Sequence, residues 1–150
     1  MNKTKITLLA VSFIVMTTFA SRGFSAEQDK EPWTQQQLLE PADLAKILNG
    51  PKATQPIVYS IGPGAIIKNS IHIGPAGERD HLKKFKQQLD KLPKEANIVI
   101  YCGCCPFNKC PNIRPAFKLM NEMGFKNHKL LNLPRNIKVN WLDKGYPVNE

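Results

Sequence analysis

The sequence predicts an α/β fold, a single domain with an open parallel sheet flanked by helices on both faces. Short runs rich in β-branched residues alternate along the chain with amphipathic segments of helical period. One run, residues 97–102 (NIVIYC), is continuously apolar after its first residue, as are strands in the middle of a parallel sheet. No internal repeat divides the chain, so one domain with one core is expected.

The first half of the domain contains one expected helix and two expected strands. Residues 40–50 (EPADLAKILNG) predict a helix, because a proline suits its first turn and Asn-Gly suits its end. Residues 56–62 (PIVYSIG) form a β-branched run that ends in a Gly-Pro-Gly loop, which indicates a strand. Residues 65–74 (AIIKNSIHIG) are expected to form a second short strand, closed by Gly-Pro.

The second half continues the alternation. Residues 79–92 carry apolar side chains at helical spacing and predict an amphipathic helix, which the apolar strand at 97–102 follows. Residues 114–125 (RPAFKLMNEMGF) predict a helix with a proline near its first turn and a glycine at its end. A last strand is expected at 128–133 (HKLLNL), and a final short helix within 136–147.

The N-terminal region indicates an exported protein. Two lysines precede an uncharged, largely apolar run of about 15 residues, short of the ~20 that a membrane-spanning helix needs. Residues 1–26 are therefore predicted to be a signal peptide, with an uncleaved anchor as the alternative, and residues 27–37 a flexible lead-in in which Trp33 could clamp onto the domain. We expect the mature protein to be periplasmic or secreted, with no membrane segment.

The charge pattern gives little support to a nucleic-acid partner. Loss of residues 1–26 would remove three basic residues and no acidic ones, which lowers the formal charge from +9 to +6. The remaining lysines are scattered over amphipathic segments and form no basic patch with interleaved aromatics. We therefore expect a monomer that binds no nucleic acid. His81 and His128, which lie among lysines, are expected to be exposed, and Phe117 and Trp141 are expected to lie in the core.

The four cysteines lie within nine positions, between the apolar strand and the following helix. Cys102 ends the strand, where ligands of open α/β sheets bind and where the next helix points its free N–H groups. Those groups favour a thiolate, so Cys102 is the predicted nucleophile. Arg114, at the helix start, is predicted either to orient an anionic substrate and stabilise the thiolate or to cap a neighbouring loop. Gly103 is predicted to supply a positive φ beside the nucleophile.

Three segments resemble the rhodanese domain of thiosulfate sulfurtransferases. Residues 40–48 resemble its opening helix, residues 97–125 its active-site strand, cysteine loop and helix, and residues 130–148 (LLNLPRNIKVNWLDKGYPV) its closing segment. The resemblance covers about residues 38–148, so residues 38–150 are assigned to a rhodanese-like domain. The loop is similar to that of an exported bacterial subgroup with Cys-Gly-Cys-Cys-Pro and Cys-Pro-Asn-Ile-Arg-Pro sequences.

The resemblance implies a sulfurtransferase without a cofactor. Cys102 would hold sulfane sulfur as a persulfide and pass it to a thiophilic acceptor. The implied partners are a small sulfur-containing anion and a thiol acceptor, which includes protein thiols. Two features depart from the family pattern, since Ser60 and Gly62 stand where its first strand ends in Asp-x-Arg, and Cys102 and Arg114 are twelve positions apart instead of about five or six.

The sulfurtransferase needs one cysteine, so the others call for a second explanation. The predicted substrate-binding loop consists of Gly103, Cys104, Cys105 and Cys110, and three explanations of its extra cysteines remain open. The first is a disulfide such as Cys105–Cys110 or Cys104–Cys110, which either staples the loop or leaves a thiol free for a thiol–disulfide or persulfide relay. The second is a copper or zinc site, and the third is a binding module that has lost its chemistry. The metal ligands in the second case would be Cys102, Cys104, Cys105 and Cys110.

Overall fold

The computed structural model describes residues 30–150. They form an α/β domain around a five-stranded sheet that is parallel throughout, in the order β1-β5-β4-β2-β3. The strands are β1 (Leu38–Leu39), β2 (Ile57–Ser60), β3 (Ile71–His72), β4 (Ile98–Tyr101) and β5 (His128–Leu131). The α-helices are α1 (Pro41–Leu48), α2 (Arg79–Leu89), α3 (Ile113–Glu122) and α4 (Ile137–Asn140), with short 3-10 turns at Gln35–Gln37, Lys52–Thr54, Phe107–Lys109 and Leu142–Lys144.

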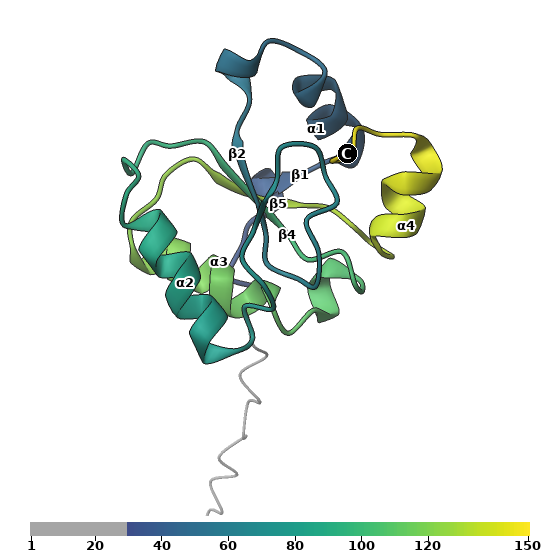
Figure 1. The fold of residues 1–150 in the computed structure, drawn as a ribbon. Coiled ribbons are helices and arrows are strands. Elements are labelled where there is room, and N and C mark those ends of the chain that lie inside the picture. The colour runs from purple at the N-terminus through teal and green to yellow at the C-terminus, as the bar shows by residue number, and fades with distance from the viewer. Residues whose placement is uncertain (1–29) are drawn as a thin grey trace, which may run out of the picture.

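Helices cover both faces of the sheet, as the sequence predicts. In Figure 1, α2 and α3 lie on one side, and α1 and α4 on the other. The central strand β4 contributes side chains to the cores on both faces of the sheet, because successive side chains of a strand point to opposite faces. Ile98 and Ile100 pack in the core with α2 and α3, while Val99 and Tyr101 pack in the core with α1 and Trp141. Burial on both faces explains the uninterrupted apolar run of β4.

The expected strand at residues 65–74 is largely wrong, since only Ile71–His72 pair with β2. The residues before them form a loop that the buried Tyr101 hydroxyl holds by accepting bonds from the Ile66 and Ile67 N–H groups at 2.9 and 3.1 Å. These donors thus bond a side chain instead of a neighbouring strand. Sequence analysis also missed the two-residue β1 and placed the end of α2 three residues too late.

Trp33 packs on the domain as expected. Its ring lies 5.9 Å from that of Phe107 and 5.7 Å from that of Phe117, and it is 8% exposed. Phe117 and Trp141 are buried as predicted, but the expectation of an exposed His128 is wrong. His128 packs against Phe117, and its Nε2 lies 2.8 Å from Asn121 Oδ1, so the neighbouring lysines were a poor guide to its burial.

The predicted signal peptide and residues 27–29 of the lead-in lie outside the described residues. Within residues 30–150, no helix has both the length and the apolar character needed to cross a membrane.

Candidate active site at the cysteine loop

Cys102 directly follows the central strand, at the carboxyl edge of the parallel sheet. It continues the alternation of β4, so its side chain enters the core shared with α2 and α3 and is only 3% exposed. The loop after β2 closes over it. A Cβ on Gly62 would lie 2.7 Å from the Cys102 sulfur and 2.4 Å from its carbonyl oxygen, so only glycine fits there. Ser60, at the end of β2, donates to the Gly64 carbonyl at 2.6 Å and thereby holds this loop.

Gly103 turns the chain back toward Cys102. Its φ is +87°, as predicted, and a Cβ at this position would lie 2.9 Å from Ile137 Cβ. After this turn the Cys104 sulfur lies 3.2 Å from the Cys102 sulfur, and the Cys105 sulfur lies 3.2 Å from that of Cys104. All four cysteines are free thiols, and Cys104 is the exposed one.

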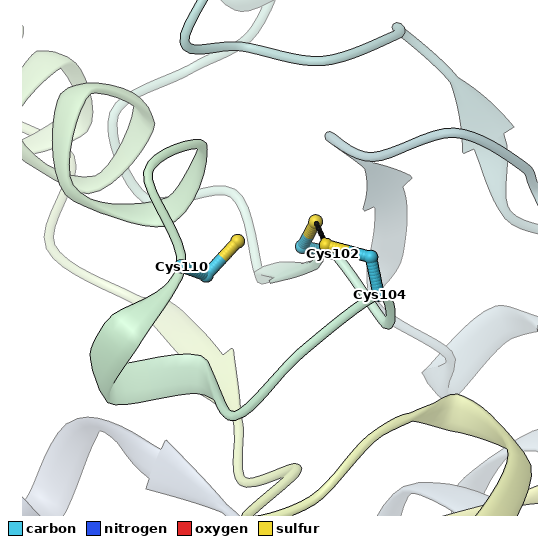
Figure 2. Close-up of side chains that lie close together, drawn as sticks. All are labelled: Cys102, Cys104 and Cys110. Carbon is cyan, nitrogen blue, oxygen red and sulfur yellow. Dashed lines mark hydrogen bonds between the residues drawn. The ribbon is translucent and has the colours of Figure 1, made fainter.

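Cys110 completes the cluster from the other side of the loop. Figure 2 shows its sulfur directed toward Cys102 from the segment that precedes α3. The Cys102, Cys104 and Cys110 sulfurs all lie within 4.8 Å of one another, and Cys110 is buried. The loop therefore brings together the sulfurs of three of the four cysteines that were predicted to form the site. Cys105 lies at its edge, next to Cys104.

Asn112, the residue before α3, donates a hydrogen bond to the thiolate position. Its Nδ2 lies 3.3 Å from Cys102 Sγ, and its Oδ1 accepts from the Gly77 N–H at 2.9 Å. Because the Gly77 N–H requires an acceptor, it orients the amide with its NH₂ group toward the sulfur. Asn112 is 8% exposed, so solvent competes little for this bond.

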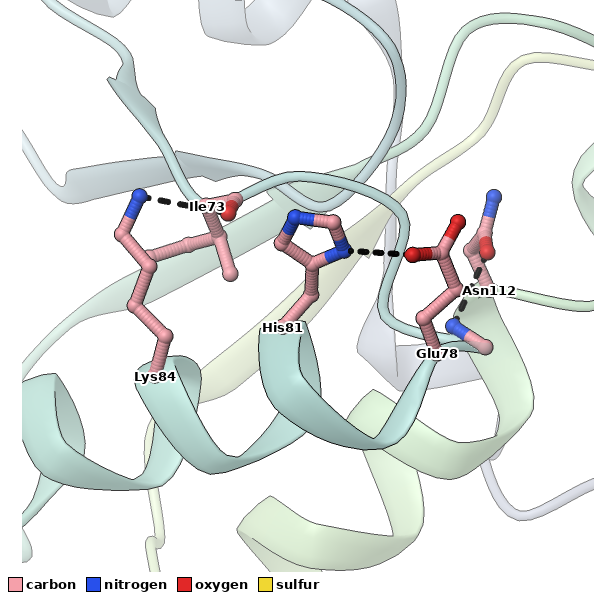
Figure 3. Close-up of polar contacts among 6 residues, drawn as sticks. Ile73, Glu78, His81, Lys84 and Asn112 are labelled. Carbon is pink, nitrogen blue, oxygen red and sulfur yellow. Dashed lines mark hydrogen bonds and ion pairs between the residues drawn. The ribbon is translucent and has the colours of Figure 1, made fainter.

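The segment that carries Gly77 is itself held to α2, as Figure 3 shows. Lys84 donates to the His72 and Ile73 carbonyls at 3.1 and 3.3 Å. His81 Nδ1 lies 3.2 Å from a Glu78 carboxylate oxygen, one turn earlier. These contacts fix the loop between β3 and α2, and with it the donor that orients Asn112.

The hydrogen bonds of the cluster favour one thiolate. Donation from the Cys110 thiol has the largest effect on the pKa of Cys102. Together with donation from the Asn112 amide and from the N–H and thiol of Cys104, it outweighs the effect of burial and lowers this pKa to about 5. The pKa of Cys110 rises because its thiol donates to Cys102, and burial together with the same thiolate raises the pKa of Cys104 to about 12. Cys102 is therefore the anion, and its two neighbours are thiols that donate to it.

Arg114 lies outside this group. Its Nη2 donates to Glu31 at 2.9 Å and to the Asn108 carbonyl at 3.2 Å, and its guanidinium stacks 5.5 Å from the Trp33 ring centre. These contacts match the second predicted role, that of capping a neighbouring loop. Arg114 therefore does not contact the Cys102 sulfur, whose hydrogen-bond donors include the neutral Asn112 amide and Cys104 thiol.

Sequence reasoning missed Asn112, Gly62 and Gly77. Asn112 carried a usable signal, because an asparagine that precedes a predicted helix start and adjoins a cysteine loop is a residue type that commonly bonds such a segment. Gly62 and Gly77 carried none, because their contacts join segments far apart in the chain.

Comparisons with protein-family models and with curated proteins found no match to this chain. The all-parallel sheet with helices on both faces is consistent with a single rhodanese-like α/β domain.

Proposed function

We propose that this protein is an exported sulfurtransferase of the rhodanese type, in which Cys102 carries sulfane sulfur as a persulfide. The observation that carries the proposal is the hydrogen-bonded environment of Cys102 Sγ at the carboxyl edge of the sheet. Asn112 Nδ2 lies 3.3 Å away, and the Cys104 sulfur lies 3.2 Å away. Donors of this kind around a buried sulfur stabilise its anionic form, which is the nucleophilic form.

The chemistry needs no external oxidant. The Cys102 thiolate attacks the outer sulfur of an anion such as thiosulfate, the sulfur–sulfur bond of the donor breaks, and sulfite leaves with the electron pair. A thiophilic acceptor then attacks the outer sulfur of the persulfide, and the Cys102 thiolate returns as the leaving group. A low pKa suits Cys102 to that second step, because thiols of lower pKa leave faster.

The test is a burst experiment on reduced protein. Mixing with thiosulfate should release one sulfite per chain, and cyanide added as the acceptor should give thiocyanate with turnover. The Cys102→Ser variant should release no sulfite, and the fold should remain intact because serine has nearly the size of cysteine. If the wild type released no sulfite from thiosulfate and no leaving group from several other sulfane-sulfur anions, the proposal would be contradicted.

A soft-metal site is the second candidate, and the three converging sulfurs favour it. Thiolates suit copper(I) and zinc, but structural zinc sites have four ligands. Since Cys105 lies outside the group, copper(I) held by Cys102, Cys104 and Cys110 fits better. Competition with a chromogenic copper(I) chelator tests this candidate. One copper per chain, lost in each of the three single serine variants, would support it, and no retention of copper would exclude it.

A further inference from the structure

We infer that Cys104 is a resolving cysteine that converts the Cys102 persulfide into a Cys102–Cys104 disulfide and expels the carried sulfur as hydrosulfide. The inference rests on the proposed function, since it needs a persulfide on Cys102. It adds that the sulfur leaves by reduction within the loop and that the partner of this protein is a dithiol reductant.

The separation of the two sulfurs decides which atom Cys104 attacks. Reacting atoms in near-attack arrangements lie about 3 to 3.5 Å apart, and the Cys104 sulfur lies 3.2 Å from Cys102 Sγ. In-line attack on the outer sulfur would need the two Sγ atoms about 5 Å apart, from a bond of about 2.05 Å and an approach of about 3 Å. The observed distance therefore favours attack on Cys102 Sγ.

The step balances without another reactant. A bond forms between the Cys104 and Cys102 sulfurs, and the bond from Cys102 to the outer sulfur breaks. The outer sulfur, which is anionic in the persulfide, takes up the Cys104 thiol proton, so that Cys104 attacks as a thiolate. The outer sulfur then leaves with the electron pair as HS⁻. The two cysteine sulfurs are together oxidised by two electrons, and the sulfane sulfur is reduced by two.

The backbone and the burial of the two residues suit this role. Gly103, with its φ of +87°, makes the turn that returns Cys104 to Cys102. Cys102 is 3% exposed, whereas Cys104 is exposed, so a bulky acceptor thiol reaches Cys104 more readily than the persulfide. Cys110 is less suited because it is buried behind the loop.

The greater exposure of Cys104 than of Cys102 also favours reduction of the disulfide by an external dithiol. The reductant would attack the exposed Cys104 sulfur, and Cys102 would depart as a thiolate stabilised by Asn112. The mixed disulfide on Cys104 is then resolved by the second thiol of the reductant. The loop would thus return to its reduced state without exposure of Cys102.

The test is a single turnover under anaerobic conditions. Reduced full-length protein, freed of reductant, is mixed with thiosulfate, and released sulfite, released sulfide and intact mass are followed together. The wild type should release one sulfite and then one sulfide per chain and end two hydrogens lighter. Cys104→Ser, whose hydroxyl can still donate to Cys102, should release one sulfite per chain at a reduced rate, and Cys104→Ala should do so more slowly, because the Cys104 thiol is a donor to Cys102. Both variants should lose sulfide release and retain one added sulfur atom. Addition of dithiothreitol should restore sulfite release by the wild type.

Each outcome separates this inference from the proposed function. If the wild type and both Cys104 variants release no sulfite from thiosulfate and no leaving group from other sulfane-sulfur anions, the persulfide does not form, which refutes the proposed function. Sulfite release with a persistent wild-type persulfide would refute the resolving role alone. Sulfide release that survives in the Cys104 variants but is lost in Cys105→Ser or Cys110→Ser would assign the resolving step to another thiol and overturn the inference.

Discussion

Replacing Asn112 with aspartate removes one donor from the Cys102 thiolate while it keeps the acceptor for the Gly77 N–H. Hydrogen bonds to charged groups contribute about 1.5 to 3 kcal/mol. Because each tenfold change in an equilibrium is about 1.4 kcal/mol, the lost bond should raise the pKa of Cys102 by about 1 to 2. The added carboxylate acts in the same direction, so a pKa that starts at about 5 should reach at least about 6 to 7.

The assay is a titration of the ultraviolet absorbance of the thiolate, measured as the difference between each protein and its Cys102→Ser counterpart. The matched control is Asn127→Asp, the same change at the opposite edge of the sheet, where the amide donates to the Glu95 carbonyl. The control should leave the titration of Cys102 where it is in the wild type. An unchanged pKa in Asn112→Asp would refute the argument that this amide stabilises the thiolate.

Three further predictions concern stability. Gly62→Ala would set a methyl group 2.7 Å from Cys102 Sγ, so urea unfolding should show a loss of about 1 to 3 kcal/mol, and a neutral result would contradict the contact. Tyr101→Phe leaves the Ile66 and Ile67 N–H groups without their acceptor, so the free energy of unfolding in urea should fall by about 1 to 3 kcal/mol. An unfolding midpoint equal to that of the wild type would mean that water replaces the hydroxyl. Because folding lowers the pKa of Cys102 from 9.0 to about 5, its thiolate contributes stability that is complete above about pH 9 and is lost as the pH falls to about 5. The raised pKa values of Cys104 and Cys110 affect stability only above about pH 9. Cys102→Ser should therefore flatten the rise in unfolding free energy between about pH 5 and 9. An unchanged slope would show that other groups cause this rise.

Features that depend on neighbouring residues in the chain were predictable from the sequence. The period of the apolar positions predicted α2, and a proline near the start with a glycine at the end predicted α1 and α3. The unbroken apolar run of β4 indicated a strand buried on both faces. The position of Cys102 followed from the same run, since a residue that ends a central strand lies at the carboxyl edge of the sheet. The positive φ of Gly103 was predictable because a cysteine loop that leaves a strand needs a sharp turn.

Only the tertiary structure decided what surrounds the Cys102 sulfur. The sequence offered Arg114 as the partner, but a long side chain reaches in several directions, and its bonds to Glu31 and Asn108 lead away from the cluster. Asn112 took that place because the Gly77 N–H, 35 positions earlier, orients its amide. Hydrogen bonds and close contacts act over a few ångströms in space whatever the separation along the chain, so local sequence patterns predict the elements and the folded chain determines the chemistry between them.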